Sequence, residues 1–88
     1  MSYRVEFKPK AVDDLRHIDK AMAQRVLRRL KWFSENFDTV TSEPLTAELK
    51  GLFKLRVGSY RVIYEAKSKE HLLIIHFIGH RKEVYKRK

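Results

Sequence analysis

Basic side chains and one aromatic ring are the residues of this chain whose types and spacing suit a chemical reaction. Lys54, Arg56 and Arg61 surround a Gly-Ser pair, and Arg81 and Tyr85 follow in the last stretch. Arginine offers forked donors that match phosphate oxygens, and a tyrosine ring can stack on an unpaired base. A lysine whose charged form is disfavoured by neighbouring cations can act as a general base. The set predicts RNA cleavage without a metal, in which a 2′-hydroxyl attacks the adjacent phosphate and cations stabilise the transition state.

Two further side chains are candidates for acid–base work. His80 stands beside Arg81, and histidine is the residue type whose side chain changes its charge near neutral pH. Glu48 precedes the basic stretch and would serve as a base if the loop that carries Glu48 folds over the basic residues. His76 and His80 have the same parity along one predicted strand and so would face the same side of the sheet, but they lie too far apart to share a metal ion, and no acidic partner stands near them. We therefore expect no metal and no other cofactor, and RNA binding without cleavage remains an alternative.

Composition limits the architecture and the location. With 88 residues, the chain predicts one small domain spanning 1–88 with a modest core. It has no cysteine, which excludes disulfides and thiolate metal sites. No apolar run approaches the length of a membrane span, and the first residues do not form a signal peptide. We expect a protein of the cytoplasm.

The charge is large and uneven. The net charge is +9, and residues 45–88 carry eleven Lys or Arg against four Asp or Glu. A basic surplus concentrated in one part of a small domain is typical of proteins that bind nucleic acid. No long basic helix with a bulky apolar face is present, so we expect no membrane partner.

The residues from Phe53 to Tyr64 alternate apolar and basic side chains around Gly58-Ser59, which predicts a hairpin with a tight turn. In this hairpin Arg56 lies directly opposite Arg61. Two facing arginines repel each other, so folding alone gives no reason for the pair. A polyanion between them would explain it; a solvated basic face is the alternative. The apolar face would pair Phe53 with Tyr64, Leu55 with Val62 and Val57 with Tyr60, and Lys54 would face Ile63 on the basic side.

Periodicity predicts the other elements. Alternation gives a first strand over Tyr3–Phe7, and helical spacing gives helices over Pro9–His17 and about Lys20–Phe37. A loop is expected over Asp38–Glu48, and a central apolar strand over His71–Gly79.

The resulting fold class is α+β. A single small domain begins with a strand, continues with a two-helix hairpin and ends with antiparallel strands that form a curved sheet. The helices are expected on one face of the sheet and the basic residues on the other. If Lys67 pairs with Glu70 in the second turn, Arg61 lies opposite His76, which then joins the basic face.

The segment LKGLFKLRVGSYRVIYEA and the ending IIHFIGHRKEVYK resemble the RelE/ParE superfamily of bacterial toxins, over essentially the whole chain. The pattern G-x-Y-R-hydrophobic-hydrophobic-Y marks the superfamily, and H-R-x-x-V-Y resembles its RelE branch. Members of that branch cut messenger RNA in the ribosomal A site and are toxins of type II toxin–antitoxin systems. The resemblance implies a RelE-like fold, an endoribonuclease, and three partners: a cognate antitoxin, mRNA in the A site and 16S rRNA.

The resemblance also implies roles for individual residues. Lys54 and Arg56 occupy the two basic positions before the turn, and Arg61 matches the arginine that stabilises the phosphate. Arg81 matches the arginine that protonates or stabilises the leaving group, and Tyr85 matches the tyrosine that stacks on the base. Both basic positions before the turn are lysines in the best-known RelE pattern. Arg56 cannot readily lose a proton, so the base would be Lys54, His80 or Glu48.

Two rival functions remain. One is inhibition of DNA gyrase, as in ParE-like toxins, which share the hairpin but generally lack the full basic set and the final tyrosine. The other is an inactive RNA-binding relative. The presence of Arg61, Arg81 and Tyr85 together favours cleavage.

Overall fold

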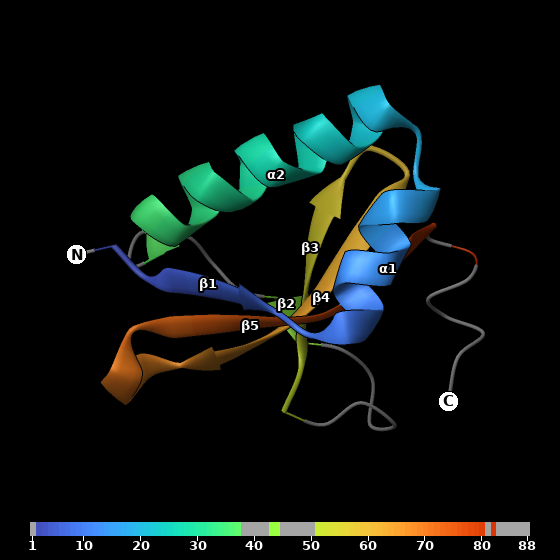
Figure 1. Cartoon of the computed structure of the whole chain (residues 1–88). Coiled ribbons are helices and arrows are strands. Elements are labelled where there is room, and N and C mark those ends of the chain that lie inside the picture. The colour runs from blue at the N-terminus through green and yellow to red at the C-terminus, as the bar shows by residue number, and fades with distance from the viewer. Residues whose placement is uncertain (1, 38–42, 45–50, 81, 83–88) are drawn as a thin grey trace.

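The structure, a computed structural model, describes residues 2–37, 43–44, 51–80 and 82. Its elements follow the predicted order of a strand, two helices and then antiparallel strands (Figure 1). The α+β class is therefore confirmed. The elements are β1 (Arg4–Phe7), α1 (Pro9–His17), α2 (Lys20–Glu35), β2 (Glu43–Pro44), β3 (Phe53–Val57), β4 (Tyr60–Lys67), the 3-10 turn η3 (Ser68–Glu70) and β5 (Leu72–His80).

The predicted bounds are close to the observed ones. Helix α1 has the expected range, and Pro9 occupies its first turn, where a missing N–H costs nothing. The Asp19 carboxylate caps α2 by accepting a hydrogen bond from Met22 N at 3.2 Å. Helix α2 ends two residues before the predicted Phe37, and the two-residue strand β2 lies within the predicted loop. The rest of that loop lies outside the described residues.

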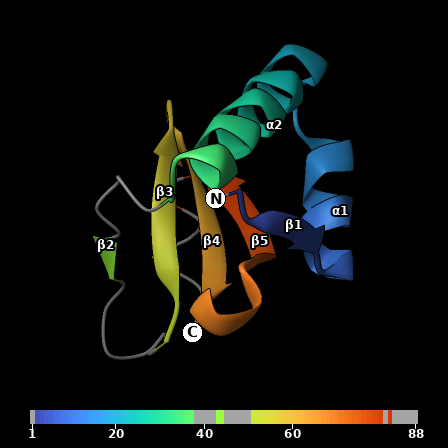
Figure 2. The ribbon, with the colours of Figure 1, turned by 90° about the vertical axis from the view of Figure 1, so that its left-hand side faces the viewer.

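The sheet has the strand order β1-β5-β4-β3-β2. Strand β1 pairs with β5 in parallel, and the other neighbours are antiparallel. The last strand in the sequence is therefore central, which agrees with its apolar composition. The sheet twists strongly, with β1 at one edge and β2 at the other (Figure 2).

Both helices pack on one face of the sheet. Helix α2 reaches from β1 to β3, and α1 lies against β5 (Figure 1). The apolar stripe of α2 packs on the sheet, where Val26, Leu30 and Phe33 are buried. Tyr64 is fully buried there, and its ring meets Phe33 edge-on at 5.2 Å. The core comprises Tyr3 before β1, Ala11, Val26, Leu30 and Phe33 from the helices, and Leu55, Val57, Val62, Tyr64, Leu73, Ile75 and Ile78 from the sheet.

The predicted register of the first hairpin is confirmed in every pair. Arg56 lies opposite Arg61, and Lys54 lies opposite Ile63. Gly58 has a φ of +59°, a left-handed conformation that glycine adopts without strain. The turn approaches α2 closely, since a Cβ at Gly58 would lie 3.3 Å from an Arg25 guanidinium nitrogen.

The predicted register of the second hairpin is wrong. Arg61 lies opposite Gly79 and not opposite His76. The turn is longer than expected, because η3 and the left-handed His71 (φ 52°) make Lys67 pair with Leu72. A bulge then shifts the register again between Ile63 and Tyr64, so that His76 has no partner in the ladder.

Candidate functional site

Arg61 is held in a fixed position on the sheet face turned away from the helices. This face carries Lys54, Arg56, Arg61, Ile63 and Glu65 from β3 and β4, and we call it the far face. The Arg61 side chain is only 8% exposed, an unusual burial for an arginine. Its Nη1 donates to the Tyr60 carbonyl at 3.1 Å and to the Gly58 carbonyl at 3.3 Å. The turn carbonyls thus fix one edge of the guanidinium.

The remaining donors of Arg61 are only partly used. Its Nε is buried and has no hydrogen-bond partner. A buried donor without a partner costs about 1–3 kcal/mol, which an incoming acceptor would recover. Gly79 lies directly opposite Arg61 in the ladder. A fixed, buried cation with an unused donor is suited to an anionic ligand such as a phosphate.

Lys54 and Arg56 lie beside Arg61 on the far face. Arg56 is exposed and sits directly across the ladder from Arg61. Lys54 is partly exposed and lies opposite Ile63, one diagonal step from Arg61. The structure therefore brings together three of the predicted site residues, all near the first hairpin.

The far face is less uniformly basic than the sequence predicts. Ile63 is fully buried, and Phe77 lies opposite it. Beyond Ile63, the Glu65 carboxylate lies within hydrogen-bonding distance of His76, with 3.1 Å between Glu65 Oε1 and His76 Nε2. The expectation that no acidic side chain stands near His76 is therefore wrong. The cations are concentrated at the hairpin end, and an acidic and imidazole pair lies at the other end.

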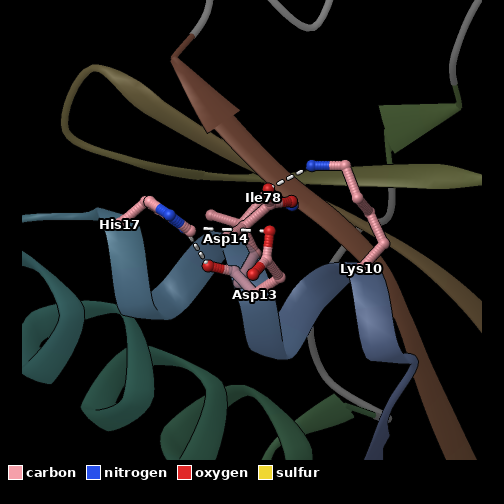
Figure 3. A network of polar contacts seen from close by, with 5 residues as sticks. All are labelled: Lys10, Asp13, Asp14, His17 and Ile78. Carbon is pink, nitrogen blue, oxygen red and sulfur yellow. Dashed lines mark hydrogen bonds and ion pairs between the residues drawn. The ribbon is translucent and has the colours of Figure 1, made fainter.

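His80 lies on the opposite side of the sheet from Arg61. It pairs with Tyr60, whose ring it meets edge-on at 5.7 Å, and Tyr60 packs against the helix-side core. A polar pocket of about 150 Å³ adjoins His80. Asp14 and His17 of α1 line this pocket. Figure 3 shows the Asp14 side chain between α1 and β5. Because of the bulge at His76, His76 and His80 lie on opposite sides of the sheet, whereas the sequence predicted one side for both.

Three predicted site residues, Glu48, Arg81 and Tyr85, lie outside the described residues. Their roles stay predictions. Within the residues that the structure describes, no group of three His, Asp or Glu side chains is arranged to hold a metal ion. In that same part of the chain, no helix has the length and apolar character to cross a membrane.

Sequence reasoning missed the polar contacts on the helix side. Asp14 accepts a hydrogen bond from Ile78 N and also pairs with Lys10 (Figure 3). The signal was weak, because an aspartate within a helix is ordinarily a solvated surface residue. Its partner lies 64 residues away, beyond any local pattern.

The chain matches known toxins over nearly its whole length. Residues 5–85 match the family model described as the ParE toxin of the type II toxin–antitoxin system parDE. Toxin RelG of Mycobacterium tuberculosis is 28% identical over 87 residues, which cover 99% of this chain and 100% of that protein.

Solved structures agree with this fold. The toxin–antitoxin complex RelBE2 from M. tuberculosis contains a chain with a TM-score of 0.82 and 28% identity, covering 92% of this chain and 93% of that one. The archaeal RelE–RelB complex from Pyrococcus horikoshii contains a chain with a TM-score of 0.72 and 28% identity, and the match covers 92% of this chain and 97% of that one. A free-state mutant of RelE from Escherichia coli has a TM-score of 0.77 at 18% identity, and the match covers 98% of this chain and 93% of that one. At this identity the match shows a similar fold.

Proposed function

Since the chain belongs to the ParE toxin family of type II toxin–antitoxin systems, we propose that it is an endoribonuclease that cuts messenger RNA in the ribosomal A site. The observation that carries this proposal is Arg61, a nearly buried guanidinium with an unused donor beside two further cations. Relatives that bear the names RelG and RelE add support for the RelE branch.

The reaction needs no metal ion. The 2′-hydroxyl of the substrate attacks the neighbouring phosphorus and loses its proton to a base, and the P–O5′ bond breaks as the 5′-oxygen gains a proton. The products are a 2′,3′-cyclic phosphate and a 5′-hydroxyl. Arg61 and Arg56 stabilise the extra negative charge on the phosphate in the transition state. Lys54 is the candidate base among the described residues of the far face.

The residues outside the described part complete the proposed site. Arg81 would stabilise or protonate the leaving group, and Tyr85 would stack on the substrate base. Glu48 is a second candidate for the base. His80 is less well placed for that role, because it shares the helix side of the sheet with Tyr60.

The proposed partners follow from the same function. A cognate antitoxin would neutralise the chain, and the ribosome would present mRNA beside 16S rRNA. Both RNA partners fit the net charge of +9. The proposed location is the cytoplasm, where ribosomes translate.

The test is brief induction in a bacterial host followed by primer extension on an abundant message. Discrete cuts within translated codons are expected from the native chain. They should vanish in Arg61→Ala and Arg81→Ala, while both variants remain folded by circular dichroism. Retained toxicity and cutting in both variants would overturn the proposed site.

A second function is favoured by one observation, the match to a family model named for ParE. In that case the chain would inhibit DNA gyrase by binding it, and no RNA would be cut. Growth arrest without cuts, together with loss of gyrase supercoiling in vitro, would support this alternative. If the induced chain causes neither growth arrest nor cuts, it is an inactive RNA-binding relative.

A further inference from the structure

A second group of cations lies on helix α2, together with an exposed aromatic ring. Arg25, Arg29 and Trp32 are all exposed, and the Arg29 guanidinium lies over the Trp32 ring, 4.8 Å from its centroid. Residues three and four positions apart are neighbours on a helix surface, so these three side chains form one strip along α2. We call this strip the α2 track.

The charges of the α2 track do not stabilise the helix. Arg25 and Arg29 are four positions apart, where like charges on a helix repel each other. Neither arginine has an acidic residue three or four positions away in the sequence. Among the residues that the structure describes, neither forms an ion pair with a carboxylate. A polyanion bound along the track would offset the repulsion.

The α2 track begins at the turn that holds Arg61, and Figure 1 shows this turn beside the first half of α2. A Cβ built on Gly58 would lie 3.3 Å from Arg25 Nη1, so Arg25 covers the turn from the helix side. The carbonyl of the same glycine accepts a hydrogen bond from Arg61 Nη1, at 3.3 Å. The two guanidinium groups therefore flank one exposed residue. A ligand strand that passes around Gly58 can contact both cations in turn.

Single-stranded RNA is the polyanion that matches both kinds of side chain. Arginine pairs with phosphate oxygens, and a tryptophan ring stacks on an unpaired base. Trp32 keeps 44% of its surface exposed although Arg29 lies over its ring. We propose that the α2 track binds the unpaired RNA strand that continues beyond the cleavage site, with phosphates on Arg25 and Arg29 and a base on Trp32. The inference rests on the proposed RNA cleavage and adds to it a binding surface on another element.

The first experiment uses Trp32 as its own probe, since it is the only tryptophan of the chain. The purified chain is titrated with an oligouridylate whose 2′-O-methyl riboses prevent cleavage. A base stacked on Trp32 should quench its fluorescence. A duplex RNA of equal length should not, because its bases are already stacked on one another. The titration involves no reaction, so it tests the track apart from cutting.

The second experiment compares substitutions on the two sides of α2. Arg25→Ala and Arg29→Ala should each weaken binding of a labelled oligouridylate. Each should also reduce the steepness of log Kobs against log [salt] by about 0.7, the value for one phosphate contact on a single strand. Lys31→Ala is the control with an equal loss of charge, because Lys31 is exposed but lines the pocket between α2 and β1. It should leave the affinity and the salt dependence near their native values.

Substitutions of Trp32 separate stacking from charge. Trp32→Ala should weaken binding about tenfold, the cost of one lost base stack, and leave the salt dependence unchanged. Trp32→Tyr keeps a stacking ring and should recover most of the affinity. Circular dichroism checks that every variant is folded. On programmed ribosomes, Trp32→Ala should raise KM and leave kcat near its native value, because the track does not touch the reacting phosphate.

The outcomes separate this inference from the proposed function. Native affinity in both Arg29→Ala and Trp32→Ala overturns the track and leaves cleavage at Arg61 intact. Equal losses in Arg29→Ala and Lys31→Ala would mean that net charge alone binds RNA, which also overturns the track. Quenching by the oligouridylate in a chain that cuts no message supports the track and contradicts the proposed cleavage.

Two other occupants would be recognised in the same titration. Equal binding of the duplex, without quenching, identifies structured RNA as the ligand and overturns the choice of an unpaired strand. A change of Trp32 fluorescence with the protein encoded by the adjacent reading frame, and none with the oligouridylate, identifies a protein partner and overturns the choice of RNA.

Discussion

The carboxylate of Asp14 accepts a hydrogen bond from the backbone N–H of Ile78, with 2.9 Å between Oδ2 and N. Strand β1 pairs with β5 only as far as Ile75, so the edge of β5 beyond that point lacks a strand partner on this side. Asp14 supplies the missing acceptor from α1 (Figure 3). A helix side chain thus continues the bonding of the central strand where the parallel strand ends.

This contact predicts a loss of stability in Asp14→Ala. The Ile78 N–H would be left without an acceptor in a site where the aspartate is only 10% exposed. We expect the free energy of unfolding to fall by about 1–3 kcal/mol in urea titrations. Asp14→Asn keeps an oxygen acceptor and should lose less. Asp13→Ala, at an exposed position of the same helix, is the control and should be nearly neutral.

Substitution of Arg61 should separate charge from geometry. Lysine keeps the positive charge but cannot bond two turn carbonyls and a phosphate with one planar group. We expect Arg61→Ala to reduce cutting by on the order of 10²-fold or more, and Arg61→Lys to recover only a small part. The measurement is the cutting rate on programmed ribosomes. Arg28→Ala, which removes an exposed cation from α2, should cut normally. Equal losses in Arg61→Ala and Arg28→Ala, with native cutting in Arg61→Lys, would mean that only net charge matters.

The hairpin turn predicts a cost for any Cβ at Gly58. A left-handed backbone costs an alanine about 1–2 kcal/mol. The nearby Arg25 guanidinium can move aside, because it is the end of a flexible side chain. Gly58→Ala should therefore lower the free energy of unfolding by about that amount, and Gly58→Asn should lower it less, as measured by thermal unfolding. Gly51→Ala is the matched control, since Gly51 has a φ of +83° and open space around it. A much larger loss at Gly58 than at Gly51 would show that Arg25 cannot move.

The pair of Glu65 and His76 is expected to be structural. Their side chains are 35% and 20% exposed, so solvent screens the interaction. Glu65→Ala should lower the free energy of unfolding by less than about 1 kcal/mol and leave the cutting rate within twofold of native. A tenfold loss of cutting in a folded Glu65→Ala would instead place this pair in the reaction.

Local patterns were sufficient to predict much of the fold. The alternation around Gly58-Ser59 fixes the first hairpin, because a two-residue turn leaves only one register. Asp19 and Pro9 mark the starts of the two helices through their local hydrogen-bonding and steric preferences. These signals all act over a few residues.

The second hairpin could not be predicted in the same way. Its register depends on the four-residue connection through η3 and on a bulge that leaves His76 without a partner. The bulge allows Ile75 and Ile78, three residues apart, to face the helices together. It also moves His80 to the side opposite Arg61, which reverses the histidine parity deduced from the sequence. The packing of Ile75 and Ile78 in the core determines where the bulge lies, and no local sequence motif predicts its position.

The central position of β5 has a consequence for how the chain folds during synthesis. Strand β1, at the start of the chain, completes its hydrogen bonds only with a strand that is made after both helices and the first hairpin. The apolar faces of β1 and α2 are therefore exposed on the nascent chain until β5 emerges from the ribosome. Such late, long-range pairing folds slowly and leaves time for another protein to bind first.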